Sequence, residues 1–235
     1  MATVLRNPNS NKIKVIYFSK PQYIRKITSN KRYFNYLQNE IRGLQWYQKY
    51  SKNKNDLIKY NKNSNFFFLD IKFFKGKKNI FYKSIEENTF LISKAIDHYL
   101  KIWPNKTRVR CHGDLTIDNI IFNKNKIKFI DWELSGLSKE PWGYDLIYLL
   151  ISSIYFPYEI KKTINVSEKN VFIKLWTKLR RLNISNDLLN DPLSFITKVH
   201  KKKRWREAIK DHPKKLYPVF INKDFEIILK ELIKL

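Results

Sequence analysis

The stretch "RVRCHGDLTIDNIIFNKNKIKFIDWELSG", residues 108–136, contains four carboxylates and one histidine around two short apolar runs. The runs "IIF" and "IKFI" flank the turn sequence "NKNK" and predict a β-hairpin. Asn119 stands just before the first strand of this hairpin and Asp131 just after the second, so their side chains should emerge at the same end. Together with Asp114 from the preceding loop, they offer the hard oxygen ligands that a divalent cation requires.

The spacing of these residues is informative. His112-x-Asp114-x4-Asn119 has the form H-x-D-x-x-x-x-N, and Asp131 follows after the hairpin. The stretch resembles the aminoglycoside phosphotransferase and choline kinase group, whose loops read like "HGDLxxxNIIF" and "IDWExxG". The resemblance implies an α+β, two-lobed protein-kinase-like fold, in which a small antiparallel β N-terminal lobe with one helix precedes a larger, mostly helical C-terminal lobe.

The resemblance also implies cofactors and roles. ATP and Mg²⁺ are the expected cofactors, and the γ-phosphate is expected to move to a hydroxyl group of a small molecule. Asp114 orients that hydroxyl and takes its proton, while Asn119 and Asp131 hold Mg²⁺. His112 is expected to be a structural brace for the loop.

Three further acids lie in or near this stretch. Glu133 resembles the second acid of the family's "DxE" element and is either a metal ligand through water or a solvent-facing side chain. Asp118 is expected to be exposed and uninvolved. Asp145 precedes a predicted helix, and helix capping accounts for it.

The N-terminal region, residues 1–74, is predicted to be the nucleotide-binding lobe. "ATVLRN", "KIKVIYFS" and "QYIRKIT" read as three antiparallel strands, and "NFFFLDIKFF", residues 65–74, as the last strand of the sheet. Between them "YFNYLQNEIRGLQWYQKY" has apolar residues at helical spacing, namely Phe34, Leu37, Ile41, Leu44 and Tyr47 or Gln48.

Candidate nucleotide contacts lie on these elements. The resemblance to the family's "xLKxT" strand and "ExxxLxWL" helix makes Lys26 the phosphate-contacting lysine and Glu40 its partner. Arg25 is the next choice, because a register slip of one residue exchanges the two faces of a strand. No G-x-G-x-x-G motif exists; Ser10 and Asn11 in "RNPNSNK" could contact phosphates, or could form an ordinary hairpin turn.

The strand that ends near residue 74 would lead into a hinge between the lobes. There the backbone groups of Lys72, Phe73 and Phe74 could meet the edge of an adenine ring.

Residues 75–235 are predicted to form the catalytic and acceptor-binding lobe. Apolar spacing predicts a helix over residues 84–102 that Pro104 stops, and mostly helical structure from about residue 145. The apolar run Leu146–Phe156 is too short to span a bilayer and reads as a buried helix.

The net charge of +26 raises the question of a polyanionic partner. Only ten of the 47 basic residues are arginine, and lysine occurs with asparagine and isoleucine along the whole chain, as codon bias in an AT-rich genome would produce. Nucleic acid is therefore an unexpected partner. Lys198–Lys215, the densest basic run, reads as a solvated helix face or, alternatively, as a docking site for a phosphate-bearing substrate, a membrane or nucleic acid. One cysteine and no signal-like N-terminal run indicate a cytoplasmic protein.

The acceptor is the least determined part. Polycationic aminoglycosides demand acidic pockets, whereas Lys and Arg outnumber Asp and Glu by 47 to 21. A sugar or an amino alcohol such as choline ranks higher, and Trp132, Trp142 and Tyr144 are among the aromatic residues that could form either a cage or core. Two alternatives stay open: an inactive kinase-like binding module, and a basic nucleic-acid-binding protein. The sequence does not determine the oligomeric state.

Overall fold

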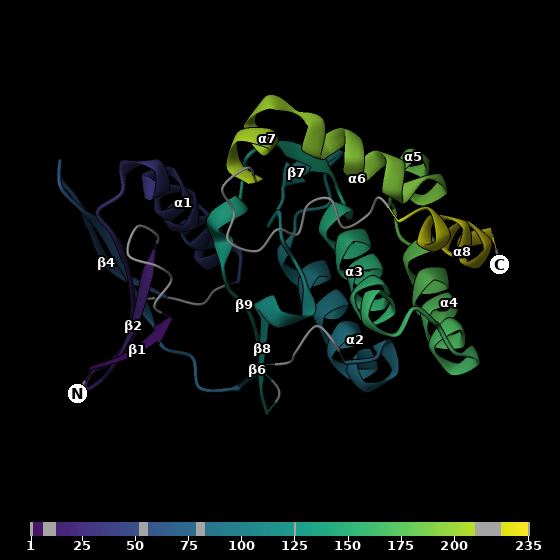
Figure 1. The fold of residues 1–235 in the computed structure, drawn as a ribbon, viewed down its shortest axis with the longest axis horizontal. Helices are drawn as coiled ribbons and strands as arrows, with labels where there is room; N and C mark the ends of the chain where they lie inside the picture. Colours follow the sequence, from purple (N-terminus) through teal and green to yellow (C-terminus); the bar gives the residue numbers. More distant parts are fainter. Residues whose placement is uncertain are drawn as a thin grey trace. The chain divides into compact units, whose positions relative to one another are not determined.

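The computed structural model describes residues 2–6, 13–51, 56–78, 83–124, 126–209 and 222–234. Two compact units make up the chain (Figure 1). The first consists of Met1–Lys75 with Asp131–Gly136, and the second of Gly76–Ile130 with Leu137–Leu235. The predicted α+β class, with an antiparallel sheet followed by a helical majority, is confirmed.

A five-stranded antiparallel sheet dominates the first unit. Its order is β1-β2-β3-β5-β4, from strands Ala2–Arg6, Lys14–Ser19, Gln22–Thr28, Leu57–Lys62 and Phe67–Lys72 in chain order. The four strands predicted from sequence are present. β4 was not predicted, because this edge strand is exposed along almost its whole length and lacks the alternation of buried and exposed residues.

Helix α1, Phe34–Ser51, packs against this sheet after the 3-10 turn η1, Lys31–Tyr33. The predicted apolar face is buried, with Tyr47 rather than Gln48 as its last member. Gly43 lets α1 approach η3, the 3-10 turn Trp132–Leu134 of the same unit. A Cβ at this position would lie 2.7 Å from Trp132 Cβ, closer than side chains tolerate.

The second unit contains the predicted hairpin as β8, Ile120–Asn123, and β9, Lys126–Phe129. The 3-10 turn η2, Ile117–Asn119, leads into β8. Three short strands were not predicted because two or three residues carry no periodic signal: β6 joins the hairpin at Lys77–Lys78, and β7, Arg108–Arg110, pairs with β10, Lys139–Pro141.

The helices of the second unit confirm the prediction that the chain is mostly helical beyond residue 145. They are α2 to α8 in chain order: Ile85–Ile102, Tyr144–Lys161, Val166–Arg180, Asn186–Asn190, Pro192–Lys201, Lys203–Ile209 and Lys223–Lys234. α2, α3 and α4 pack against one another (Figure 1).

Helix boundaries follow the local sequence. A capping box of Ser84 and Glu87 starts α2, which ends before Pro104. α3 is buried from Tyr144 to Tyr158, as its apolar run predicts. Within the described part of the chain, no helix combines the length and apolar character needed to cross a membrane.

Candidate active site

Lys26, at the centre of β3, holds two carboxylates of the first unit. Its Nζ donates to Glu40 Oε2 at 2.6 Å and to Asp131 Oδ1 at 2.7 Å. Glu40 lies on α1, and Asp131 is 105 positions further along the chain. The structure therefore brings together a strand lysine, a helix glutamate and the aspartate that follows the hairpin.

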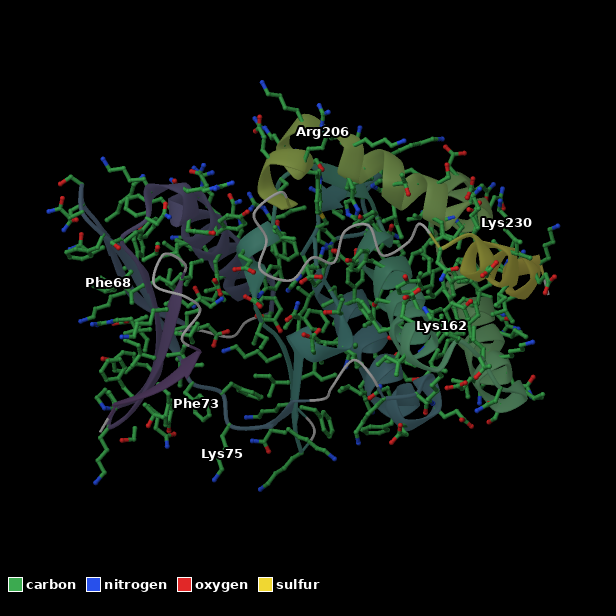
Figure 2. All side chains as sticks on the ribbon, viewed as in Figure 1. Phe68, Phe73, Lys75, Lys162, Arg206 and Lys230 are labelled. Carbon is green, nitrogen blue, oxygen red and sulfur yellow. The ribbon has the colours of Figure 1, made fainter. Side chains whose placement is uncertain are left out.

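Arg25, the alternative to Lys26, points to the opposite face of the strand. Its guanidinium donates to both oxygens of Asp70, at 2.7 and 2.8 Å, and lies 4.5 Å from the ring centroid of Phe68. Phe68 lies on β5 and is labelled in Figure 2. The Arg25 guanidinium is therefore occupied by a bidentate ion pair within the sheet. Lys26 is the cation of β3 that faces Glu40 and Asp131.

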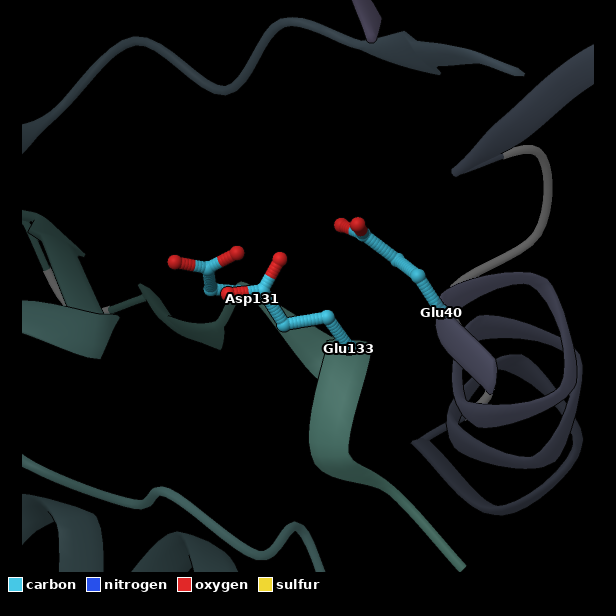
Figure 3. A group of neighbouring side chains, drawn as sticks. All are labelled: Glu40, Asp131 and Glu133. Atoms are coloured by element: carbon cyan, nitrogen blue, oxygen red, sulfur yellow. The ribbon is translucent and has the colours of Figure 1, made fainter. Parts of the chain in front are cut away.

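Glu133 extends the carboxylate group to three. Glu40, Asp131 and Glu133 each offer an oxygen, and these oxygens lie within 4.8 Å of one another (Figure 3). Glu40 is 1% exposed and Glu133 7%, so Glu133 is not a solvent-facing acid. We call Lys26, Glu40, Asp131 and Glu133 the carboxylate cluster.

The charges in the carboxylate cluster do not balance. Burial raises the pKa of Glu40 to about 7; the Lys26 ammonium lowers it, and the charges of Asp131 and Glu133 raise it further. Burial alone would lower the pKa of Lys26, but Asp131, Glu40 and Glu133 together raise it above its ordinary value. Three carboxylates around one lysine leave negative charge that a divalent cation could offset.

The backbone at Asp131 is held in an unusual conformation. Its φ of 67° and ψ of 58° lie in the left-handed region, which costs a residue other than glycine about 1 kcal/mol or more. The next residue, Trp132, packs on α1, where its ring centroid lies 4.9 Å from that of Tyr47. Packing on α1 thus fixes the turn that aims Asp131 and Glu133.

In the second unit, the loop His112–Asn119, here called the catalytic loop, is anchored by α3. The backbone N–H groups of His112 and Gly113 donate to Asp145 Oδ2 at 2.8 Å and Oδ1 at 3.1 Å. The prediction that Asp145 caps its own helix is wrong, because Gly143 holds the N-cap position and the Asp145 carboxylate reaches 33 positions back. Burial raises the pKa of Asp145 to about 7, although the two backbone hydrogen bonds lower it.

His112 and Asn119 hold the two ends of the catalytic loop. His112 Nε2 lies 2.9 Å from the carbonyl oxygen of Ile130, the contact that a bracing role requires. The amide nitrogen of Asn119 donates to the backbone oxygen of Asp114 at 2.7 Å and to Asp114 Oδ2 at 3.1 Å. The Ile130 N–H in turn donates to the Asn119 carbonyl at 2.9 Å, so hydrogen bonding continues beyond the β8–β9 hairpin.

The other amide atom of Asn119 is free to bind a cation. Asn119 is fully buried, and among the residues that the structure describes its Oδ1 has no hydrogen-bond partner. A buried acceptor without a donor is costly unless another positive group meets it. The side chain therefore fits the predicted role of a metal ligand.

Asp118 differs from the prediction. It is 8% exposed rather than solvent-facing, and the hydroxyl of Thr116 donates to its Oδ1. The 3-10 turn η2 places residues 117–119 in the interior, which sequence spacing alone did not indicate.

The remaining predicted residues are those expected to contact the nucleotide. Ser10 and Asn11 lie outside the described residues. The N–H of Lys72 donates to Asp56 O at 2.7 Å and that of Phe73 to Gln22 O at 3.4 Å, so both donors are used inside the first unit. The Phe73 ring contacts Tyr17 at 4.8 Å between centroids, and Phe74 is half-buried.

Two other expectations from the sequence concern surfaces. Trp132, Trp142 and Tyr144 are all buried and pack in the interior, as the core alternative predicts. In the basic run, Lys202 Nζ donates to both oxygens of buried Glu140 at 2.6 and 2.9 Å, and Trp205 Nε1 donates to Ser138 at 2.6 Å, while Arg206 projects from α7 (Figure 2). This part of the run is thus solvated on one side only; residues 210–215 lie outside the described range.

The fold, in which an antiparallel sheet precedes a helical majority, is protein-kinase-like. A model of the phosphotransferase enzyme family (APH) matches residues 82–164, which include the catalytic loop and "IDWE". This match confirms, over those residues, the resemblance to the aminoglycoside phosphotransferase and choline kinase group.

The solved structures similar to this chain include two kinases. An amicoumacin kinase in complex with AMP-PNP, Ca²⁺ and Ami has a TM-score of 0.55 and 13% identity, covering 99% of this chain and 86% of its own. A Plasmodium vivax ethanolamine kinase has a TM-score of 0.46 and 13% identity, covering 94% and 83%. No protein with a curated description matches the sequence. At this identity the amicoumacin kinase shows a shared fold.

Proposed function

We propose that the protein is a phosphotransferase that moves the γ-phosphoryl group of ATP to a hydroxyl group of a small molecule. The observation that carries the proposal is the position of Lys26, whose ammonium bridges a helix glutamate and the aspartate of "IDWE". In protein-kinase-like enzymes a lysine paired in this way contacts the ATP phosphates. The family-model match over residues 82–164 supports the same reaction class.

Residues 1–74 bind the nucleotide in this proposal. Lys26 contacts phosphate oxygens, and Glu40 keeps the lysine oriented through the 2.6 Å contact. Ser10 and Asn11 are proposed to add phosphate contacts, and the backbone of Lys72, Phe73 and Phe74 to lie at the adenine edge. The amicoumacin kinase of similar fold was solved with AMP-PNP, which supports a nucleotide in this role.

Mg²⁺ is the proposed metal, and when bound it would offset the charge of the moving phosphoryl group. Asn119, whose Oδ1 has no hydrogen-bond partner among the described residues, and Asp131 are the proposed ligands, with Glu133 as a further acid. Carboxylate and amide oxygens are the donors that Mg²⁺ prefers. Ca²⁺ in the amicoumacin kinase structure supports a divalent cation in general.

Residues 75–235 supply the base and the acceptor site. Asp114 orients the acceptor hydroxyl and takes its proton, while Asn119 holds one oxygen of this carboxylate at 3.1 Å. His112 braces the loop through Ile130. The basic composition supports a sugar or an amino alcohol such as choline over a polycationic antibiotic.

The test is transfer of labelled phosphate from ATP to a panel of choline, ethanolamine, common hexoses, aminoglycosides and a protein mixture, with and without Mg²⁺. We expect Mg²⁺-dependent labelling of one small-molecule class. Lys26→Met should remove ATP binding, whereas Lys59→Met, a matched change at an exposed lysine of the same sheet, should leave it intact.

Other results would point to the alternatives. ATP binding without transfer to any acceptor would favour an inactive binding module. Salt-sensitive binding to any DNA or RNA, with no ATP turnover, would favour a nucleic-acid-binding protein.

A further inference from the structure

The basic run of α6 and α7 is fixed to the strand pair β7–β10 by buried polar contacts. Lys202 Nζ donates to both oxygens of Glu140, which is fully buried on β10. Trp205 Nε1 donates to Ser138 Oγ at 2.6 Å, and Trp205 is 1% exposed. A solvated charged helix needs neither contact, and burying a carboxylate costs free energy that its ion pair must offset. The two contacts therefore hold α7 in one position against β10.

Cationic side chains from three segments of the chain lie at this junction. β7 and β10 are paired so that Arg110 lies opposite Lys139, and the Arg108 guanidinium donates to the Lys139 carbonyl at 2.8 and 3.2 Å. On α7, Arg204 and Arg206 are exposed, one on each side of the buried tryptophan, and Figure 2 shows Arg206 projecting from the helix. With the lysine that precedes them, these residues form what we call the arginine patch: Arg108, Arg110, Lys139, Lys203, Arg204 and Arg206.

Arginine is concentrated in this patch, whereas lysine is not. Lysine is abundant along the whole chain, as codon bias would produce, but the chain has only ten arginines, and four of them lie in the patch. The two segments that supply them, residues 108–110 and 204–206, are so short that an even distribution would place fewer than one arginine there. Composition therefore does not account for the patch.

The charge of the arginine patch is poorly neutralised. For all its members except Arg110, the described part of the chain contains no carboxylate in ion-pair contact. Glu140, the buried acid beside the patch, pairs with Lys202 instead. Like charges held together repel one another, so an anionic partner would stabilise the arrangement. Because arginine offers a planar fork of N–H donors that fits two oxygens at once, phosphate is an anion that suits this patch.

The layout of the arginine patch indicates which phosphate-bearing partner fits. Arg108 and Arg110 alternate with buried Val109, so both side chains emerge from the same face of β7, about 7 Å apart along the strand. Repeated cations of this kind match the repeated phosphates of a nucleic acid. The three segments expose no aromatic side chain, since Trp205 is buried. Exposed aromatic rings are what proteins use to stack on single strands and to insert at membrane surfaces, whereas a duplex bound through its backbone needs none.

We propose that the arginine patch binds the phosphate backbone of a nucleic acid duplex without reading its bases. The inference goes beyond the proposed phosphotransferase function and does not rest on it. The lysine-rich composition did not favour nucleic acid as a partner, but the arginines that the tertiary structure gathers do. Binding of this kind releases counterions at each phosphate contact, so the affinity falls as salt rises.

The test is fluorescence anisotropy of the full chain with labelled duplexes of about 20 base pairs, one of DNA and one of RNA, from about 50 to 200 mM NaCl. If the patch contacts about four phosphates, log affinity should fall against log salt with a slope of about −3.6, or about 150-fold over this range. The double variant Arg204→Gln with Arg206→Gln should make the slope shallower by about 1.8, because two contacts are lost. Salt-sensitive binding to either duplex that this variant weakens supports the proposal.

The matched control is Arg180→Gln with Arg181→Gln, at the end of α4 in the same unit, where both arginines are also exposed. It removes the same charge outside the patch and should leave the affinity within about twofold. No binding to either duplex, or equal losses in the two double variants, overturns the proposal. Tighter binding to vesicles of phosphatidylcholine and phosphatidylserine than to the duplexes also overturns it, in favour of a membrane. ATP turnover plays no part in these measurements, so they remain decisive if the proposed phosphotransferase function fails.

Discussion

The carboxylate cluster and the catalytic loop are stabilised in different ways. In the cluster, Lys26 faces three carboxylates, so its arrangement depends on charge and carries surplus negative charge. In the catalytic loop, the N–H groups of His112 and Gly113 are bound by Asp145 inside a buried helix, so its arrangement depends on directed hydrogen bonds. The cluster should therefore respond to cations and pH, and the loop to the loss of single side chains.

The largest effects should come from replacing one acid in each region. Asp114→Asn and Asp131→Asn should each reduce kcat about 10³-fold or more, because one removes the proposed base and the other a proposed metal ligand. Circular dichroism should show intact folding. Asp97→Asn, at an acid that is 46% exposed, is the control and should retain activity. Full activity of Asp114→Asn would refute its role as the base.

Loss of the loop anchor should be the next largest effect. Asp145→Ala leaves two backbone N–H groups buried without an acceptor, and should lower the free energy of unfolding by about 3 kcal/mol in urea titrations. Asp187→Ala, at an exposed acid in the first turn of α5, should lower the free energy of unfolding by only about a few tenths of a kcal/mol. Equal losses would mean that the loop does not depend on Asp145.

His200, on α6, and Glu40, in the carboxylate cluster, should make protein stability respond to acid in opposite directions. Burial lowers the pKa of His200 to about 3. Below pH 6.5 the unfolded chain therefore takes up a proton that the folded chain does not bind, and the protein loses stability as pH falls. Relative to His200→Gln, the wild type should lose about 2 kcal/mol between pH 6.5 and about pH 5.

Glu40 should give the opposite dependence of stability on pH. Because the pKa of Glu40 is raised to about 7 from 4.5, its contribution is fully present below pH 4.5 and is lost as pH rises through 7. Relative to Glu40→Gln, the wild type should gain stability on acidification. Urea titrations across this pH range measure both differences, and slopes of equal sign would contradict the opposite effects of burial on His200 and Glu40.

The smallest expected effect concerns cations at the carboxylate cluster. Saturating Mg²⁺ without nucleotide should raise the melting temperature by about 2–4 °C, and EDTA should reverse the change. Glu133→Gln should reduce this shift by half or more, since it removes one of the three carboxylates. Glu231→Gln is the matched control at an exposed acid. A shift that Glu133→Gln leaves unchanged would exclude Glu133 as a contributor.

Much of the fold was predictable because its signals are local. The apolar spacing from Phe34 to Tyr47 predicted α1, and the turn "NKNK" between two apolar runs predicted the hairpin. Edge strand β4 and the short strands β6, β7 and β10 were not predicted, because exposed or very short strands carry no periodic pattern.

The site was predictable only where a motif named its members. Glu40, Lys26 and Asp131 were selected by resemblance, and the structure places the Glu40 and Asp131 carboxylates within 2.7 Å of the Lys26 ammonium. Asp145 was given the wrong role and Asp118 the wrong environment. Both errors concern where a side chain points after folding, which spacing along the chain does not encode.

The sequence by itself determined the local elements and the chemistry of the motif, since both depend on neighbours a few residues apart. Only the tertiary structure decided that Asp145 binds the loop 33 positions before it. These contacts form when helix α3 packs beneath the catalytic loop. Burial then forces each polar side chain on that face to find a partner.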